Sequence, residues 1–414
     1  MSEVQRAGID RREFLVQAAG AMAAVSLLPQ VLPAAIRGDA PLRIGVVGVG
    51  RQGSAILDEL AKVETAKVLA VCDSDPRRLE RAQRKVQGAA AFSSHAEMLD
   101  KSKDLQAIII ATPTHLHKQV VLDGLAAGKH VYCEAPIAHT LEESKAIAAA
   151  ARGAKVVAAA GLEGRSDPVY KLARTFFRSD SVREVVVMRG QNLQKTTWRT
   201  PASDPARDKV LNWRLDKELS IGLGGEMGTH QFDVFCWYRD QYPASVRGSG
   251  AIVLHADGRE IHDTIACELA FPDARLLHYE ASLASSFQGR HEILHGTNAT
   301  IKLAWTHGWM FKEADAPTQG WEVYANRQQF FNDEGITLIA EATKLADQGK
   351  LKEGVGLPNS PLYYALLDFV NAAVAGKNAA ASLEVGHRAT VLGILAHQAT
   401  RTGQTIEIPA AMLQ

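Results

Sequence analysis

The chain has 414 residues and equal numbers of acidic and basic side chains, 46 of each, so its formal net charge is zero. This balance argues against a protein that binds nucleic acid through a basic surface. The length is too great for one typical core and suits two domains. The cysteines show no C-x-x-C spacing, which favours packing over metal ligation or disulfide formation; they are Cys72, Cys133, Cys236 and Cys267.

The first residues resemble an export signal. The run Asp10-Arg11-Arg12-Glu13-Phe14-Leu15 is similar to a twin-arginine motif, and an Ala-rich, mildly apolar run from 16 to 28 follows it. That run is too short for a stable membrane span, which needs about 20 strongly apolar residues. We therefore predict that residues 1–36 are a twin-arginine signal, that cleavage follows Ala35, and that the protein is periplasmic or otherwise exported by the twin-arginine machinery. The alternative is a cytosolic N-terminal helix with two chance arginines.

A glycine-rich turn follows the first strongly apolar segment of the chain. Leu42–Val47 is short and rich in β-branched residues, as expected for a buried strand, and Gly48, Gly50 and Gly53 then have G-x-G-x-x-G spacing. The first glycine permits a tight turn, the second leaves room for a pyrophosphate, and the third lets the next helix pack closely. A helix expected over 54–62 would point its positive end at the phosphates.

An acidic residue closes the next apolar run. Asp73 follows Val68–Cys72 at the distance where a carboxylate accepts the ribose hydroxyls of NAD. Its charge would repel the 2′-phosphate of NADP, so NAD is favoured. Arg77 and Arg78 follow closely and could offset that repulsion, so NADP stays possible. The turn predicts a dinucleotide site that includes Arg51 and Gln52.

Strands and helices alternate from residue 42 to about 160, which predicts a doubly wound parallel sheet with helices on both faces. The strands are expected at 42–47, 67–72, 106–111, 130–133 and 155–159, with helices at 76–86, 116–127 and 141–151.

The pattern changes after a helix expected at 167–178. The segments 185–192, 246–254, 261–271, 274–283 and 292–295 are typical of strands without helices between them, and Phe271-Pro272-Asp273-Ala274 is typical of a turn. Runs of strands predict an open, mainly antiparallel sheet, so the fold class is α/β plus α+β. Helices at 361–375 and 383–401 complete the chain, whereas 307–358 gives no regular pattern. The expected domains are 41–162 for the dinucleotide and 163–414 for substrate binding and oligomerisation.

Several motifs in this order resemble the glucose–fructose oxidoreductase and inositol dehydrogenase family. They are the glycine turn, Ala111-Thr112-Pro113-Thr114-His115-Leu116-His117, Gly128 to Pro136 with Cys133-Glu134-Ala135-Pro136, and Gly225-Glu226-Met227-Gly228-Thr229-His230-Gln231-Phe232-Asp233. The resemblance covers essentially the whole chain after the signal. It implies a sugar or polyol oxidoreductase that uses NAD or NADP and assembles as a homo-oligomer through the exposed face of its C-terminal sheet.

The resemblance also implies cofactor contacts. Thr112, Pro113 and His117 match the loop that contacts the nicotinamide half, although His117 could also be a histidine at a helix start with no such role. Glu134 matches the glutamate of a Glu-Lys-Pro motif that contacts the nicotinamide ribose, and Pro136 matches its proline.

The main departure from the family is Ala135, which stands where the family has lysine. That lysine donates a hydrogen bond to the reacting hydroxyl, and alanine has neither donor nor charge. His230 matches the family's catalytic histidine, and histidine titrates near neutral pH. We therefore predict His230 as the general base. Glu226 is four residues earlier, which on a helix would place it on the same face and allow it to orient His230.

Candidate substrate residues come from the second domain. Arg165 matches a cleft arginine of the family, and Asn192, Trp198, Trp213 and Arg214 combine aromatic faces with polar groups, as suits sugar recognition. Ordinary packing is the alternative for the tryptophans. His291 and His295 would share one face of a strand, but no third ligand is evident, so no metal is expected.

Three functions remain open. The first is an exported sugar oxidoreductase. The second is a redox-neutral NAD-dependent glycosidase or lyase that oxidises its sugar only transiently, which the missing lysine and a cofactor trapped outside the cytoplasm favour. The third is a non-catalytic sugar- or NAD-binding protein. Fold alone does not decide between them.

Overall fold

The computed structural model describes residues 40–304, 306–320, 322, 325–330, 333–340 and 356–414. The predicted export signal, residues 1–36, lies outside the described residues. The chain divides into two compact units. One contains residues 168–186 and 293–358, and the other contains 38–167, 187–292 and 359–414. Each is described by itself. None of the described helices combines the length and the apolar character that crossing a membrane requires.

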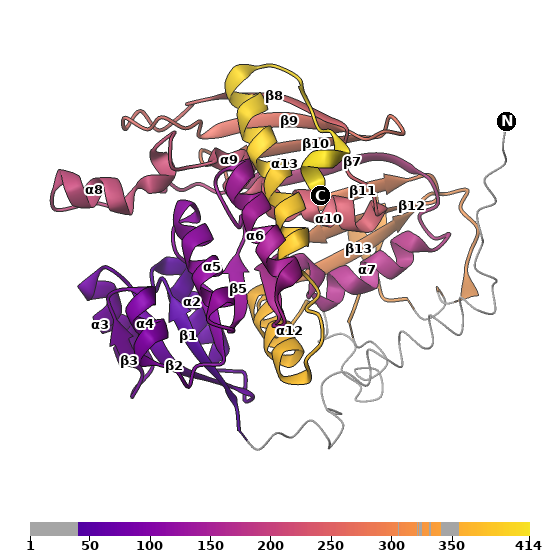
Figure 1. Ribbon diagram of the computed structural model, residues 1–414. Helices are drawn as coiled ribbons and strands as arrows, with labels where there is room; N and C mark the ends of the chain where they lie inside the picture. The colour runs from indigo at the N-terminus through magenta and orange to yellow at the C-terminus, as the bar shows by residue number, and fades with distance from the viewer. Residues whose placement is uncertain (1–39, 305, 321, 323–324, 331–332, 341–355) are drawn as a thin grey trace. The chain divides into compact units, whose positions relative to one another are not determined.

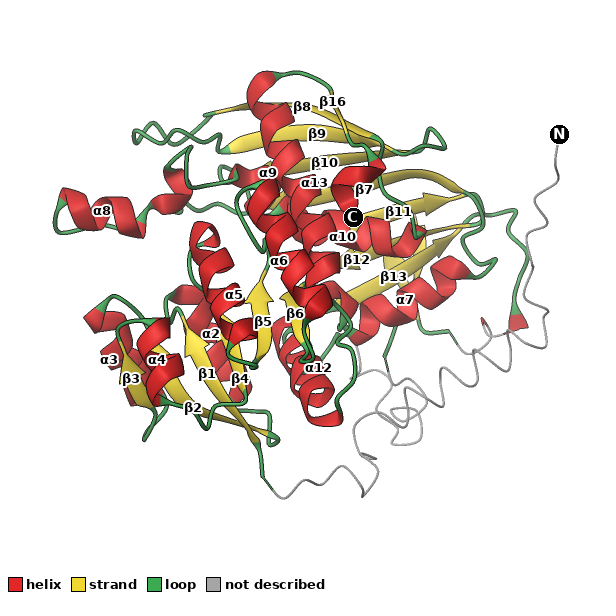
Figure 2. Ribbon diagram, viewed as in Figure 1, coloured by secondary structure: helices red, strands yellow, loops and turns green. Residues whose placement is uncertain are grey.

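A six-stranded parallel sheet forms the first part of the larger unit (Figures 1 and 2). Its strand order is β3-β2-β1-β4-β5-β6, and every neighbouring pair is parallel, as the alternating pattern predicts. The sequence pattern misses the short β3. The last strand also begins later than expected, because the Val157 N–H donates to the His130 ring at 3.0 Å. The strands are β1 (Leu42–Val47), β2 (Ala66–Cys72), β3 (Ala90–Phe92), β4 (Ala107–Ile110), β5 (His130–Glu134) and β6 (Ala158–Gly161).

Helices follow each of the first five strands, and polar side chains cap three of them. Asp75, Ser94 and Thr140 accept from backbone N–H groups at the starts of α3, α4 and α6. The helix after the glycine turn begins at Arg51, earlier than the expected 54, with Gly50 as its N-cap. The helices are α2 (Arg51–Leu60), α3 (Pro76–Lys85), α4 (His95–Lys101), α5 (His117–Ala126) and α6 (Leu141–Gly153).

The last two long helices complete the core of the same sheet. Apolar side chains of α12 (Pro361–Ala375) pack with those of β1 and α2, and the Phe369 ring lies 5.6 Å from that of Tyr132. Helix α13 (Leu383–Thr402) packs against α6, and the Thr390 hydroxyl accepts from the Ile137 N–H at 3.0 Å. The chain therefore returns to the first sheet after residue 359, and α13 holds the loop that follows β5.

The rest of the larger unit contains strands in the order β7-β10-β9-β8-β16. All these neighbours are antiparallel except β7 and β10, which are parallel, so the expectation of a mainly antiparallel sheet is confirmed. The Phe271–Ala274 turn is also confirmed, since the Ala274 N–H donates to the Phe271 carbonyl at 2.9 Å. The strands are β7 (Val185–Leu193), β8 (Ser245–Ala251), β9 (Thr264–Ala270), β10 (Leu276–Ser282) and β16 (Ile406–Glu407).

Two expectations about this region are wrong. Helices do lie between the strands: α8 (Pro205–Leu211), α9 (Gly222–Glu226) and α10 (Gly228–Arg239). The last two form because most of their residues are buried as helices, whereas α8 has no buried residue. The strand expected over 246–254 ends at Ala251. The Asp263 carboxylate accepts from the N–H groups of 253, 254 and 255, which draws that backbone into a loop.

The smaller unit contains α7 (Pro168–Arg178) and the strand order β14-β15-β13-β12, with most of β11 (Arg290–Gly296) beside β12. The region 307–358, which gave no sequence pattern, holds three short antiparallel strands among its described residues. Strand β12 is Ala299–Ala304, β13 His307–Lys312, β14 Arg327–Phe330 and β15 Asp333–Thr337.

Candidate active site

The glycine turn has the geometry that its spacing predicts. Gly48 has φ +85°, and a Cβ there would lie 2.7 Å from the backbone carbonyl of Ala111. A Cβ at Gly53 would lie 1.9 Å from the Gly48 carbonyl oxygen. No side chain caps the start of α2, so its first N–H groups are free to bind an anion. The turn therefore fits the pyrophosphate of a dinucleotide.

Asp73 ties this turn to the end of β2. Its two carboxylate oxygens accept from the N–H groups of Val49 at 2.9 Å and Asp75 at 2.8 Å. A carboxylate has further acceptor sites, which leaves capacity for a ribose hydroxyl. Arg78 lies beside it, with its guanidinium 3.4 Å from where a Cβ on Gly50 would be. A positive charge thus faces the phosphate-binding turn.

The His117 ring contacts the backbone of the loop after β4. The two nitrogens of this buried ring lie 2.9 Å from the Pro136 carbonyl oxygen and 2.8 Å from that of Thr112. Burial lowers the pKa of His117 to about 4, and a neutral ring can donate to only one of the two carbonyls. Because both nitrogens face the backbone, His117 positions the loops that carry Thr112, Pro113 and Pro136. The peptide bond between Ala135 and Pro136 is cis.

Glu134 lies buried at the carboxyl end of β5. Its Oε1 accepts from the Gln52 amide at 3.3 Å, which links it to the first turn of α2. Burial raises the pKa of Glu134 to about 8, and the negative charge of Glu163 adds to the shift. Gln52 and Glu134, both predicted cofactor contacts, are thus brought together.

His230 lies in the first turn of α10, and its ring bonds the backbone of Ala135. The residue is partly buried, but its Nδ1 is shielded from solvent and has no hydrogen-bond partner among the described residues. Burial and, to a smaller extent, the positive charge of Arg290 lower the pKa of His230 to about 3, although a hydrogen bond from the ring to the Ala135 backbone acts in the opposite direction. The ring is therefore neutral and offers Nδ1 as an acceptor. This environment disfavours its predicted role as the final proton acceptor.

Glu226 does not orient His230 in this arrangement. The two residues belong to separate helices, α9 and α10, rather than to one continuous helix. The Glu226 oxygens accept from the Thr114 hydroxyl at 3.0 Å and the Arg214 Nε at 3.2 Å. The carboxylate therefore joins the loop after β4 to the segment that carries Arg214. The expectation that i and i+4 would share a helical face is wrong because the helix breaks at Met227.

Three of the predicted substrate residues form one cluster beside Glu226. The Arg214 guanidinium lies 5.0 Å from the centre of the Trp213 ring and 5.5 Å from that of Trp198. The Trp213 ring packs edge-on against His115 at 5.5 Å. Trp198 has φ +59°, a strained conformation that is common at ligand sites. Exposed Arg214 between two indoles is chemically suited to a sugar.

The other two predicted substrate residues have protein partners. Arg165 makes a paired contact with Asp233, its Nε and one terminal nitrogen each 2.8 Å from a carboxylate oxygen. The buried Asn192 accepts from Gln194 at 3.0 Å. Arg165 therefore joins the segment after β6 to α10, and its guanidinium is paired with a carboxylate of the protein.

Sequence reasoning missed two charged residues, Glu163 and Arg290, and the charge of Arg290 acts on both Glu163 and His230. Glu163 begins the short 3-10 helix η3 (Glu163–Arg165) directly after β6, and Arg290 is the first residue of β11. The signal for Glu163 is its position: an acidic residue at the carboxyl end of a parallel strand, where ligands bind. Nothing in the sequence links Arg290 to it, because the two are brought together only by the fold.

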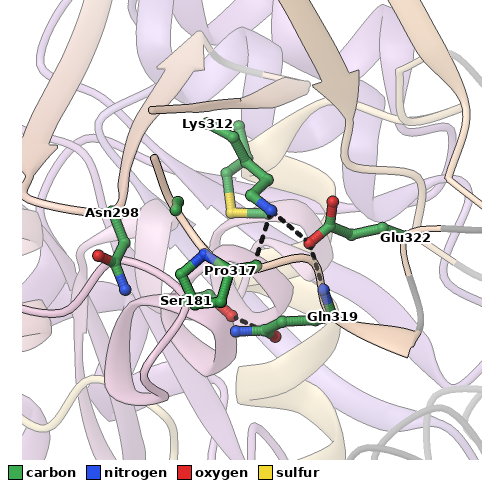
Figure 3. Close-up of a pocket in the computed structure, with 8 residues that line it drawn as sticks. Ser181, Asn298, Lys312, Pro317, Gln319 and Glu322 are labelled. Carbon is green, nitrogen blue, oxygen red and sulfur yellow. Dashed lines mark hydrogen bonds and ion pairs between the residues drawn. The ribbon is translucent and has the colours of Figure 1, made fainter. Parts of the chain in front are cut away.

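A hollow in the smaller unit has no part in this chemistry (Figure 3). Its volume of about 10 Å³ holds one water molecule at most. Lys312 Nζ lies 2.6 Å from a Glu322 oxygen, which also accepts from the Gln319 N–H at 2.7 Å. These polar groups satisfy one another.

The glycine turn, the acid at the end of β2 and the buried polar groups after β5 and β6 define a dinucleotide-binding site of the Rossmann class. Residues 42–162 match the model of an oxidoreductase family with an NAD-binding Rossmann fold, and 173–302 match that family's GFO/IDH/MocA C-terminal domain. The chain belongs to this family.

Known relatives show the same relationship. Over 204 residues, 47% of this chain and 50% of the relative, it is 28% identical to levoglucosan dehydrogenase of Pseudarthrobacter phenanthrenivorans. It is 31% identical to a glycosyl hydrolase family 109 protein of Shewanella amazonensis over 33% of this chain and 35% of that one. The chain thus matches about half or less of each of these two curated relatives. A solved levoglucosan dehydrogenase with NADH has the same fold, with TM-score 0.72 and 20% identity over 89% of this chain and 99% of that one.

Proposed function

We propose that this protein is an NAD-dependent oxidoreductase that transfers a hydride to or from a hydroxyl-bearing carbon of a sugar, polyol or sugar derivative. The observation that carries the proposal is the arrangement of one sheet edge: the glycine turn after β1 and the polar residues after β4, β5 and β6 share the carboxyl ends of parallel strands. The similarity to a levoglucosan dehydrogenase and to its NADH complex supports the same reading.

The residues divide into a cofactor group and a substrate group. Gly48 allows the tight turn, Gly50 would leave space for the pyrophosphate, and Gly53 lets α2 pack against the turn, with the N-terminus of α2 as the electrostatic partner of the phosphates. Asp73 would hold the adenosine ribose, and the Gln52–Glu134 pair the nicotinamide ribose. Bound NAD supplies the hydride acceptor. NADP is a possible replacement because Arg78 faces the turn.

On the substrate side, His230 would accept a hydrogen bond from the reacting hydroxyl at Nδ1, its free atom. Trp198, Trp213 and Arg214 would bind the remainder of the sugar, with Arg214 fixed by Glu226. The Thr114 hydroxyl also binds Glu226, so the nicotinamide loop and the sugar-binding cluster are joined through one carboxylate.

A redox-neutral glycosidase or lyase is the second candidate. Two observations favour it: Ala135 removes the lysine that donates to the hydroxyl, and one relative is a glycosyl hydrolase family 109 protein. Such an enzyme returns the hydride to its substrate, so the cofactor shows no net change.

The first experiment purifies the mature protein, denatures it and assays the supernatant for nicotinamide dinucleotide. The native protein is then incubated with NAD and with sugars, polyols and glycosides. Reduced cofactor together with an oxidised sugar supports the oxidoreductase. Cleaved glycoside without accumulated reduced cofactor supports the second candidate. Dinucleotide binding without turnover on the panel contradicts both and favours a binding protein.

We predict that His230→Ala abolishes hydride transfer and leaves dinucleotide binding intact, because Nδ1 is unpaired and the ring bonds the Ala135 backbone after β5. Single-turnover reduction of bound cofactor measures the first effect, and quenching of tryptophan fluorescence by NADH measures the second. A variant that still oxidises the sugar at the wild-type rate removes His230 from the mechanism.

We also propose export and self-association. Arg11, Arg12 and the apolar run after them support a twin-arginine signal, and fractionation of cells that produce Arg11→Lys/Arg12→Lys protein tests it.

Exposed apolar side chains in the larger unit, Val253, Leu254 and Phe287 among them, support a homo-oligomer, which light scattering of the purified protein tests.

A further inference from the structure

Glu163 is a buried carboxylate that the proposed function has not yet used. Only 9% of the residue is exposed, and no described residue donates a hydrogen bond to its side-chain oxygens. A buried carboxylate without a donor costs free energy unless a proton or a ligand compensates it. By contrast Arg165, in the same short helix η3, has its charge fully matched by Asp233.

The fold brings Glu163 next to Glu134. The two belong to the carboxyl ends of neighbouring parallel strands, since Glu134 on β5 pairs with Gly161 on β6. A Cβ on Gly161 would lie 2.7 Å from a Glu134 carboxylate oxygen, so the glycine provides the space that this carboxyl group occupies. Two acidic groups thus share one buried edge of the sheet.

This pair lies at the end of the strand after which the family lysine is missing. Ala135 follows Glu134 directly, and its backbone bonds the His230 ring. The side chain of alanine leaves the space on that side without a donor or acceptor. The polar groups near Ala135 are the unpaired Nδ1 of the neutral His230 ring and the carboxyl group of Glu134, and the charge of Glu163 acts on Glu134 in turn.

Burial and the nearby positive charge act on the pKa of Glu163 in opposite directions. Burial raises the pKa of Glu163, and the positive charge of Arg290 opposes this. Glu163 in turn raises the pKa of Glu134 and, together with burial, that of Tyr132. Arg290 is bound to Glu292 at 3.4 Å, and its charge also keeps His230 neutral. Two coupled carboxyl groups release their protons in separate steps, so one stays protonated where the other is ionised.

We propose that Glu163 is the catalytic residue that exchanges a proton with the sugar hydroxyl, in place of the lysine that Ala135 replaces. The inference rests on the proposed function. Glu134 is less suited to the role, because it is bound to Gln52 and matches a ribose contact. His230 accepts the hydrogen bond that positions the hydroxyl, and Glu163 takes the proton.

The step balances in both directions. During oxidation the O–H bond of the sugar breaks and its proton forms an O–H bond with the Glu163 carboxylate. The C–H bond breaks with its electron pair, the hydride reduces NAD⁺, and a C=O bond forms. In the reverse direction the protonated Glu163 returns its proton to the carbonyl oxygen as the hydride leaves NADH. A carboxyl group whose pKa is raised above its ordinary value can both accept and return a proton.

The test compares Glu163→Gln and Glu163→Asp with Glu142→Gln, a control at an exposed position in the first turn of α6. We expect Glu163→Gln to bind NADH with unchanged affinity and to lose at least about a hundredfold in single-turnover hydride transfer, the usual contribution of an acid–base group. Glu163→Asp should recover part of the rate. Wild-type rates in Glu163→Gln overturn the inference and leave the proposed function intact.

A titration without substrate provides a second readout. Subtracting the titration curve of Glu134→Gln from that of the wild type should show Glu134 titrating near pH 8. When the same comparison is made in proteins that carry Glu163→Gln, the midpoint for Glu134 should move to lower pH, because the neighbouring negative charge is gone. An unchanged midpoint overturns the coupling on which the inference depends. If neither the wild type nor Glu142→Gln oxidises any sugar, the proposed function is contradicted. The inference is then contradicted as well, because no sugar hydroxyl supplies the proton.

Discussion

The two ends of the candidate site are built in different ways. At the glycine turn the site is built largely of backbone: the Asp73 carboxylate accepts from the N–H groups of Val49 and Asp75, Gly50 places no side chain over the start of α2, and Gly53 lets that helix pack against the Gly48 carbonyl. At the ends of β5 and β6 the contacts are made by charged side chains, and Glu163 and the Nδ1 of His230 have no hydrogen-bond partner among the described residues.

This difference separates binding from chemistry. A site made of backbone is fixed by the fold and recognises a constant group such as a phosphate. A site made of partly satisfied side chains costs stability but can exchange protons. The same contrast occurs within the 3-10 helix η3, where Arg165 is satisfied and Glu163 is not. Substitutions at the two ends should therefore differ in what they change.

The largest effect is expected for Arg165→Ala. Removal of the guanidinium leaves the Asp233 carboxylate buried and unpaired, which costs about 3–5 kcal/mol in the free energy of unfolding. Urea denaturation measures it. Arg84→Ala, which removes an exposed ion pair with Glu80, is the matched control and should change stability by less than about 1 kcal/mol. A stable Arg165→Ala protein with weakened sugar affinity would instead restore Arg165 as a substrate residue.

An intermediate effect is expected for Gly53→Ala. The added Cβ would lie 1.9 Å from the Gly48 carbonyl oxygen, so the turn must shift. We expect a loss of about 1–3 kcal/mol in stability and no measurable NADH binding. Gly153→Ala at the end of α6 is the control, because nothing lies within 4 Å of its added Cβ. Normal NADH affinity in Gly53→Ala would show that the turn is not the phosphate site.

The smallest effect is expected for Arg78→Ala. Its guanidinium faces the Gly50 position but is partly exposed, so its removal should weaken NADH binding by about threefold and NADPH binding by about tenfold. Fluorescence titration with both dinucleotides measures the difference. Arg84→Ala on the same helix should change neither affinity. Equal losses for the two dinucleotides would mean that Arg78 contacts the pyrophosphate rather than the adenosine end.

Local sequence patterns were sufficient to predict the nucleotide-binding half in outline. Strand β1 and helix α12 have the bounds that their apolar patterns predict, and the glycine spacing identified the turn, because short-range sterics decide where a chain can bend and what it can bind there. The family membership followed from motifs in chain order and is confirmed by the matches to residues 42–162 and 173–302.

The partners of the polar groups in the substrate half could not be predicted from sequence, because folding brings them together from distant parts of the chain. Spacing placed Glu226 on the face of His230, but the helix breaks between them and Glu226 binds Arg214 and Thr114 instead. Arg165 was predicted from the sequence as a substrate contact, whereas the structure shows its guanidinium paired with Asp233. Glu163 and Arg290 are far apart in sequence, and the electrostatic effect of one on the other exists only after folding. A side chain's charge is a property of the sequence, but the partners and the burial that set its pKa belong to the fold.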